Sequence, residues 1–325
     1  GPDGDQDIIK CGSYTGNGST DGPEINLGFE PQWILLKGAS AASNWLLYDV
    51  MRGLTVGTTN AGADQLLQPH TSNAEYTDYH LSPTPTGFRV RDTGGDTNTS
   101  GNTYIYMAIR RGPLAQPESG TEVFEVFETT NTGTASTIGS MGPSDFILNK
   151  RTDAAATWRA LDRLRGGSML RTDSTDTETS SGFLEWDKMG GVFVTAAGAP
   201  YITNDAQAHW LWKRAPGFFD VVAYSGNGVR GRTVSHNLGV VPEMMWIKNR
   251  DDAQQWLVYI DSLGGTQKLY LSSTSAVITA SIDDFNNTNA EATQFTLGND
   301  GRCNANNQDY IAYLFATVPG VSKVG

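Results

Sequence analysis

The chain alternates short apolar runs with polar turns, and its apolar residues repeat with a period of two. Three runs have the length of one buried strand each: QWILLK at 32–37, DFILNK at 145–150 and MMWIK at 244–248. Two further segments, TGFRVRD at 86–92 and QFTLGND at 294–300, alternate apolar and polar positions as half-buried antiparallel strands do. Clusters of Gly, Asn, Asp and Thr separate these runs, which predicts an all-β sandwich or barrel.

Helical patterning is nearly absent. The best candidate is AATWRALDRLRG at 155–166, which has real helix propensity. It aligns with the strand-like segment WLVYID at 256–261. We therefore expect a strand followed by a turn at 155–166.

The same series of segments occurs three times along the chain. The outer two copies share YTGNG at 14–18 with YSGNG at 224–228, and LGFEPQWILLK at 27–37 with LGVVPEMMWIK at 238–248. WLLYD at 45–49 likewise corresponds to WLVYID at 256–261. A diverged copy between them carries DFILNKR, WRALD and HWLWKR, and Pro31, Pro143 and Pro242 align the three. Such repetition predicts three units of single-domain size, each with its own core.

The predicted fold is all-β, with three tandem β-sandwich units of a jelly-roll or lectin-like kind. We expect Gly1 and Pro2 to be the remnant of a removed tag, and VSKVG at the end to open a further unit, because it resembles IIKCG at 8–12. LAQPESG has a linker's composition. The boundaries are lead-in 1–9, first unit 10–113, linker 114–120, second and divergent unit 121–216, third unit 217–320, and 321–325 as the start of another unit.

Charge and composition exclude several classes of function. The chain has 35 acidic and 23 basic residues, a net charge of −12, and this argues against nucleic acid and anionic lipid as partners. No apolar run is long enough to span a bilayer, so no membrane insertion is expected. The two cysteines, Cys11 and Cys303, lie far apart in sequence and are expected to be free thiols.

Motifs for cofactors and metals are weak. GNGVRG at 226–231 has the spacing of a dinucleotide loop, but β-like residues follow it where a helix is needed, so we expect a hairpin turn. The four histidines lack zinc-site spacing. Weak candidates for Ca²⁺ are the aspartates of two Gly- and Asn-rich loops: Asp92, Asp96, Asp300 and Asp309. Solvated turns are the favoured interpretation, with no metal and no cofactor.

Aspartates that follow a tryptophan recur in each unit. Asp49, Asp162 and Asp261 are taken as one equivalent position, and a residue repeated in this way suits a shared turn better than catalysis. Paired carboxylates for acid–base work cannot be identified by spacing, and G-x-S-x-G is absent. No catalytic residue is therefore predicted, and the chain is expected not to be an enzyme.

Aromatic residues at the strand starts are the best candidates for binding. Sugar rings have apolar faces that lie flat on indole or phenol rings, and their hydroxyls take polar partners. Trp33 and Trp246 sit within apolar strands and are expected in the core. The candidate ligand-binding residues are Trp45, Tyr48, Asp49, Trp256, Tyr259 and Asp261.

The order of these motifs resembles a repeat of tail fibre and tail-associated proteins of bacteriophages, marine ones especially. YTGNG, then LGFxPxWIxxK, then WxxYDxxRG carry the resemblance, and it extends over residues 8–325. It implies a virion component, made in the bacterial cytoplasm, that contacts a host glycan or outer-membrane receptor and other tail proteins. A homotrimer is also implied, although three internal repeats could form a pseudo-threefold arrangement within one chain.

Two alternatives remain open beside non-enzymatic host adhesion. One is a tail-spike glycan depolymerase that uses paired carboxylates about 5–9 Å apart. The other is a structural fibre spacer whose ligand-binding loops lie elsewhere in the native protein.

Overall fold

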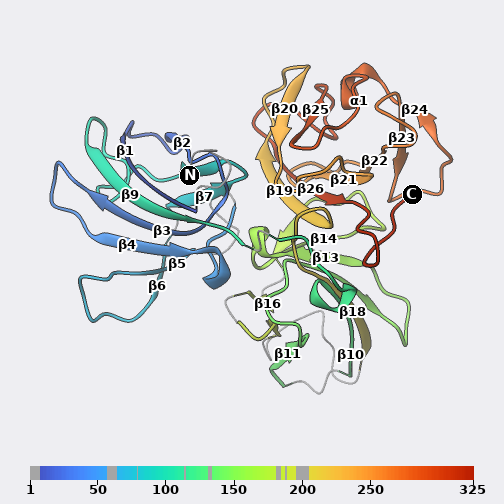
Figure 1. Ribbon diagram of the computed structural model, residues 1–325, viewed down its shortest axis with the longest axis horizontal. Helices are drawn as coiled ribbons and strands as arrows, with labels where there is room; N and C mark the ends of the chain where they lie inside the picture. Colours follow the sequence, from blue (N-terminus) through green and yellow to red (C-terminus); the bar gives the residue numbers. More distant parts are fainter. Residues whose placement is uncertain are drawn as a thin grey trace. The chain divides into compact units, whose positions relative to one another are not determined.

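The computed structural model describes residues 8–56, 64–78, 80–112, 115–130, 134–180, 184–186, 189–194 and 205–325. Residues 1–7 of the predicted lead-in, residue 113 at the end of the predicted first unit and residue 114 at the start of the predicted linker lie outside this range. The fold is all-β, as predicted (Figure 1). Contacts divide the chain into two compact units. The first holds the residues up to Gly112 together with Arg163–Gly166 and Trp186, and the second holds the rest.

One strand order occurs three times in six-stranded antiparallel sheets. The first sheet, in repeat 1, is ordered β1 (Ile9–Thr15), β9 (Thr103–Arg110), β3 (Pro31–Gly38), β4 (Trp45–Asp49), β5 (Asp64–Leu67), β6 (Tyr76–Asp78). The second, in repeat 2, is ordered β10 (Phe124–Thr130), β18 (Ala206–Trp212), β12 (Phe146–Arg151), β13 (Arg159–Asp162), β14 (Ser168–Leu170), β15 (Thr179–Ser180). The third, in repeat 3, is ordered β19 (Phe219–Ser225), β26 (Asp309–Phe315), β21 (Met244–Asn249), β22 (Leu257–Ile260), β23 (Gln267–Tyr270), β24 (Ile278–Thr279).

A smaller sheet accompanies each large one. These are β2 (Glu24–Asn26), β8 (Gly87–Val90) and β7 (Leu81–Thr84) in repeat 1, β11 (Ser136–Ile138), β17 (Val192–Val194) and β16 (Leu184–Glu185) in repeat 2, and β20 (Arg232–Ser235) with β25 (Gln294–Leu297) in repeat 3. The helical segments described are short: η2 (Val50–Arg52), η3 (Gly120–Glu122), η4 (Arg163–Arg165) and α1 (Ile282–Phe285). All five segments predicted as strands contain one, and residues 155–166 form β13 and the 3₁₀ turn η4, as predicted.

Repeats 1 and 3 each enclose an apolar core. Alternate residues of the large sheet face inward because side chains along a strand point to opposite sides. In repeat 1 the core includes Ile34, Leu36 and Leu46, and in repeat 3 it includes Ile247 and Leu257, all fully buried. Each repeat thus buries its apolar face against its small sheet, as a β-sandwich does.

The interior of repeat 2 differs, because polar residues replace apolar ones. Asn149 stands at the β12 position that Leu36 occupies in β3, and Nδ2 of Asn149 lies 3.2 Å from Nδ1 of His209. Nη1 of Arg159 donates to Oδ1 of Asn149 at 2.9 Å. Burial and the nearby Arg159 lower the pKa of His209 to about 4. This divergent repeat is therefore held partly by buried hydrogen bonds.

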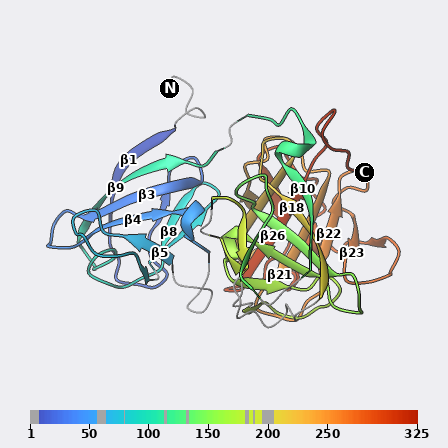
Figure 2. The same cartoon turned by 90° about the horizontal axis from the view of Figure 1, so that it is seen from below.

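Within the second unit, repeats 2 and 3 pack through the outward faces of their large sheets, the two central layers of that unit in Figures 1 and 2. The Phe146 ring lies 4.4 Å from the Tyr313 ring and 5.8 Å from the Phe219 ring, measured between centroids. The Tyr313 hydroxyl donates to the buried Asp162 carboxylate at 2.6 Å. The contact division therefore differs from the three predicted units, because it joins the second and third repeats.

Candidate functional site

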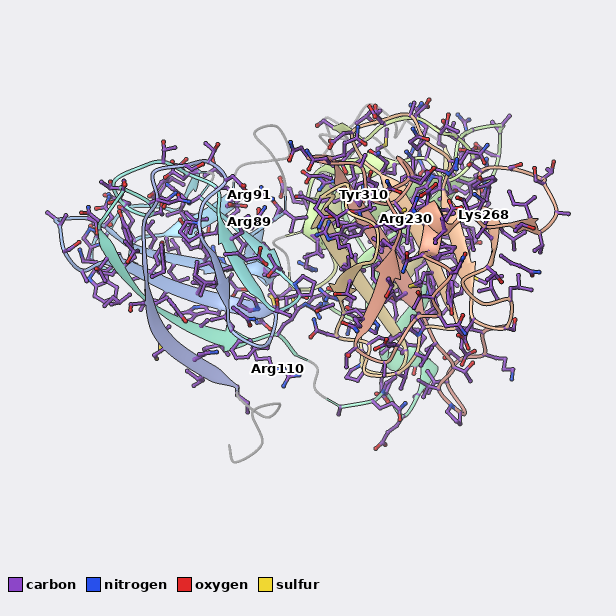
Figure 3. The ribbon with its side chains drawn as sticks, turned by 90° about the horizontal axis from the view of Figure 1, so that it is seen from above. Arg89, Arg91, Arg110, Arg230, Lys268 and Tyr310 are labelled. Carbon is purple, nitrogen blue, oxygen red and sulfur yellow. The ribbon has the colours of Figure 1, made fainter. Side chains whose placement is uncertain are left out.

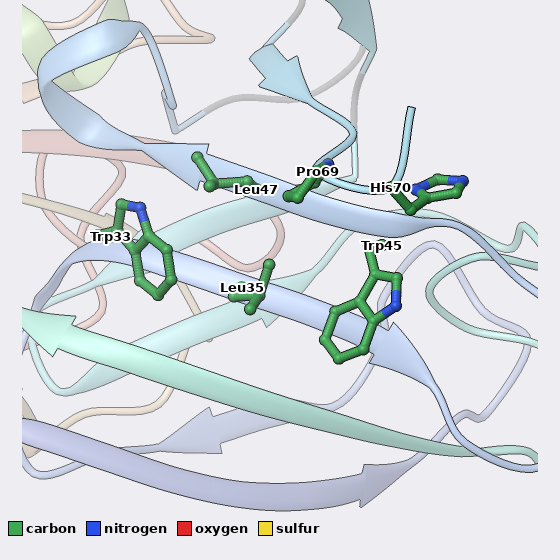
Figure 4. A pocket seen from close by; sticks show the side chains of 6 residues that line it. All are labelled: Trp33, Leu35, Trp45, Leu47, Pro69 and His70. Atoms are coloured by element: carbon green, nitrogen blue, oxygen red, sulfur yellow. The ribbon is translucent and has the colours of Figure 1, made fainter. Parts of the chain in front are cut away.

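A hollow of about 430 Å³ opens on the outward face of the repeat 1 sheet (Figure 4). Its lining comes from β3, β4 and the turn between β5 and β6: Trp33, Leu35, Trp45, Leu47, Pro69 and His70. Figure 4 shows the two indoles on either side of Leu35. We call this site the Trp33–Trp45 hollow.

Strand register places the two indoles at opposite ends of the hollow. Leu35 pairs with Leu47, and Lys37 pairs with Trp45, whereas Trp33 lies four residues before Lys37 on the same face. Four residues span about 13 Å of strand. The indoles therefore stand far enough apart to contact separate rings of one extended ligand.

Polar groups fix the start of β4 at the rim. The backbone N–H of Asn44 donates to Oδ1 of Asp96, and its Nδ2 donates to Oδ2, both at 2.7 Å. Nζ of Lys37 donates to the carbonyl and hydroxyl oxygens of Ser43 at 2.7 and 3.2 Å. Both contacts brace the residues just before Trp45, so its indole is held by a tied loop.

Trp45 is the one predicted aromatic that the structure brings to the hollow. The prediction of Tyr48 as a ligand contact is wrong, because Tyr48 is three residues further along β4 and points into the core. It is fully buried, and its hydroxyl lies 2.9 Å from Nδ1 of His80. Burial raises the pKa of Tyr48 well above its usual value.

Trp256 and Tyr259 are also wrong as ligand contacts, because both are fully buried. Trp256 donates from Nε1 to the Arg171 carbonyl at 2.8 Å, so repeat 2 covers the ring. Tyr259 donates to Oδ1 of Asp261 at 2.8 Å, and burial raises its pKa to about 12. The same motif thus leaves Trp45 half-buried and Trp256 fully buried.

The three aspartates do not share one position. Asp49 and Asp162 pair with Trp33 and Phe146, but Ile260 takes that register in repeat 3, and Asp261 follows it. One extra residue after Trp256 causes the shift, since a single step moves a side chain to the other face. Asp49 accepts from the Met51 N–H at 2.8 Å and caps η2, which agrees with a turn role there.

The calcium candidates serve internal hydrogen bonds. Asp92 accepts from the Thr97 hydroxyl at 2.9 Å, Asp300 accepts from the Arg302 N–H at 2.8 Å, and Asp309 accepts from the Ser225 hydroxyl at 2.6 Å. Asp96 holds Asn44, as described above. Among the residues that the structure describes, no three His, Cys, Asp or Glu side chains are grouped to hold a metal ion.

The loops at 92–102 and 298–309 are tied to the YTGNG and YSGNG turns. In repeat 3, Asn304 accepts from the Asn227 N–H at 3.0 Å and donates to the Val229 and Gly298 carbonyls at 2.9 and 2.7 Å. Asn98 and Asn17 make the same pairing in repeat 1. GNGVRG, the supposed dinucleotide loop, is accordingly a turn whose Gly228 has φ of +66°. These motifs are structural.

Most of the hollow is not evident from the sequence. Trp33 was expected in the core, yet it is half-buried and lines the hollow. Pro69 and His70 come from a turn about 25 residues later, which only the fold brings to β4. One available signal was that β3 and β4 carry apolar residues on both faces, although only one face meets the core of repeat 1.

Arg89, Arg230 and Lys268 have acidic partners. Figure 3 labels Arg89, Arg91, Arg110, Arg230, Lys268 and Tyr310. Nη1 of Arg89 lies 3.1 Å from Asp21, and Nζ of Lys268 lies 2.6 Å from the buried Asp284. Arg230 pairs with Asp283. Both cysteines are free, as expected, with Cys11 exposed and Cys303 buried.

Comparison with known proteins gives a family without a described activity. The model of the family described as "Domain of unknown function (DUF7483)" matches residues 6–113 and 119–325. No curated protein and no solved structure matches the chain. In the described part of the chain, no helix has the length and apolar character needed to cross a membrane. Because the family model covers nearly all residues, the chain belongs to the DUF7483 family.

Proposed function

We propose that the chain is a bacteriophage tail fibre or spike component that recognises the host surface without catalysis, and that the Trp33–Trp45 hollow binds a host glycan. The carrying observation is the pair of half-buried indoles at the two ends of one apolar hollow. Repeats of this kind, in the order seen here, resemble phage tail proteins, which supports a virion location and contact with other tail proteins.

The chemistry of the hollow suits the apolar faces of sugar rings. Indole rings offer flat apolar surface, and a pocket of this volume is within the usual range for small ligands. The ring nitrogens of His70 at the edge offer hydrogen bonds to hydroxyls. The rigid sheet carries the hollow, which limits the entropy lost on binding.

A glycan array tests the proposal. We expect the full chain to bind a subset of bacterial surface glycans, and Trp45→Ala and Trp33→Ala to lose that signal. Trp158→Ala is the matched control, because Trp158 stands at the position of Trp45 in repeat 2 and packs against Trp210 at 5.4 Å. Absence of binding at millimolar glycan would favour the structural spacer, and cleavage of a bound glycan would favour the depolymerase.

A further inference from the structure

The outward face of β1 and β9 carries apolar side chains beside the hollow. Ile9 is 57% exposed, Ile105 is 42% exposed, and Cys11 between them is exposed. Register pairs Ile9 with Ile109 and Cys11 with Met107 across the two strands. We call Ile9, Cys11, Ile105, Met107 and Ile109 the β1–β9 patch.

Four of the five equivalent positions in repeat 3 are buried, and Phe315, which corresponds to Ile109, is half-buried. The pair Ile9–Ile109 stands at the start of the β1–β9 pairing, and the pair Phe219–Phe315 stands at the start of the β19–β26 pairing in repeat 3. The two registers can therefore be matched residue by residue. The residues that correspond to Ile9, Cys11, Ile105 and Met107 are Phe219, Val221, Ile311 and Tyr313, and none is more than 1% exposed.

Repeat 2 provides the cover for that face. The Phe146 ring contacts the rings of both Phe219 and Tyr313, and Asp162 accepts the Tyr313 hydroxyl. Within this chain, the large sheet of repeat 2 therefore already buries this face of the large sheet of repeat 3. The β1–β9 patch is the same surface of the same repeat, left exposed.

We propose that a second copy of this chain covers the β1–β9 patch by packing its own β1–β9 patch against it. The five patch residues carry no formal charge, and an uncharged apolar patch is its own complement across a twofold axis. Each copy carries a net charge of −12, so salt should strengthen the association by screening the repulsion.

The contact should be weak and reversible. Strands of seven and eight residues extend roughly 25 Å, and two of them lie about 5 Å apart. A patch of that size buries less than the ~1,200 Å² of a standard interface, so we expect a dissociation constant in the micromolar range or weaker. The patch adjoins the hollow, because Ile109 and Met107 of β9 pair with Trp33 and Leu35 of β3.

Sedimentation velocity over a range of protein concentration tests the dimer. The full chain should shift from monomer to dimer as its concentration rises. The protein concentration at the midpoint of this shift should be lower at higher salt. Ile105→Asp should raise the midpoint at least tenfold, whereas Val229→Asp should not, since Val229 is 60% exposed in a turn of repeat 3. A chain that stays monomeric throughout, or equal effects of the two variants, would overturn the proposal.

Cys11 reports on the patch without any substitution. Cys303 is fully buried, so a thiol reagent modifies Cys11 alone in the folded chain. Its modification should slow as the wild-type protein dimerises, and an unchanged rate would place the contact elsewhere. Trp45→Ala should keep the dimer while losing glycan, so the failure of either proposal is distinguishable from that of the other.

Discussion

At the residue scale, Asp64 is a buried carboxyl whose hydrogen bonds do not fully offset the cost of burying its charge. Its Oδ1 accepts from the N–H and hydroxyl of Thr55 at 3.0 and 3.2 Å. Oδ2 has no partner with hydrogen-bond geometry among the described residues, although the backbone N–H groups of His80 and Leu81 near the carboxyl lower its pKa. Burial raises the pKa of this carboxyl from 3.8 to about 8. The folded state therefore favours the protonated acid.

The sign of the pH dependence follows from that raised pKa. The contribution of Asp64 to stability is greatest below pH 3.8 and declines as the pH rises toward about 8. Asp64→Asn resembles the neutral acid and keeps the Oδ1 acceptor. Above pH 8 we expect the variant to have a higher urea midpoint than wild type and a free energy of unfolding larger by up to several kcal/mol. In acid the two proteins should differ little. Equal pH profiles for the two proteins would contradict this role.

Substitutions at Trp45 and Trp256 should affect different properties, glycan binding at Trp45 and stability at Trp256. Trp256→Ala removes a fully buried indole and should cost about 3–5 kcal/mol. Trp45→Ala removes a half-buried ring and should cost less, and we expect it to weaken glycan binding. Urea unfolding of the two variants measures the contrast, and similar losses would mean that the two positions are equally enclosed.

At the scale of elements, the turns are held by side-chain amides. Asn304→Ala removes its bonds to Asn227, Val229 and Gly298, and of these the Gly298 carbonyl is buried. We expect a loss of about 2–4 kcal/mol and faster amide exchange in the 226–231 turn. Asn306→Ala, at an exposed position nearby, is the control and should change neither quantity.

The positions of the strands could be predicted from the sequence, but which neighbouring sheet covers each strand could not. Proline and polar turns bound the runs that became β3, β12 and β21, so local chemistry sufficed for them. The motif around Trp45 and Trp256 is nearly the same, but Trp256 is fully buried because repeat 2 covers it, whereas Trp45 is half-buried. Local sequence does not encode which neighbour covers a face. The extra residue between Trp256 and Asp261 shifts Asp261 by one position, so it is not equivalent to Asp49.

At the scale of the whole molecule, the second and third repeats form one compact unit. Phe146→Ala removes a ring that contacts both Phe219 and Tyr313, and should cost about 3–5 kcal/mol. Hydrogen exchange should show β12 and β26 losing protection together. Loss confined to repeat 2 would indicate that the two repeats are independent beads.

The central claim is that the open hollow of repeat 1 recognises a sugar through its two indoles. Calorimetric titration of the full chain and of Trp45→Ala with the strongest array glycan tests it most directly. The account predicts saturable binding by the full chain and at least tenfold weaker binding by the variant, since stacking on one ring is worth about 1–3 kcal/mol. Equal affinity of the two proteins would contradict it.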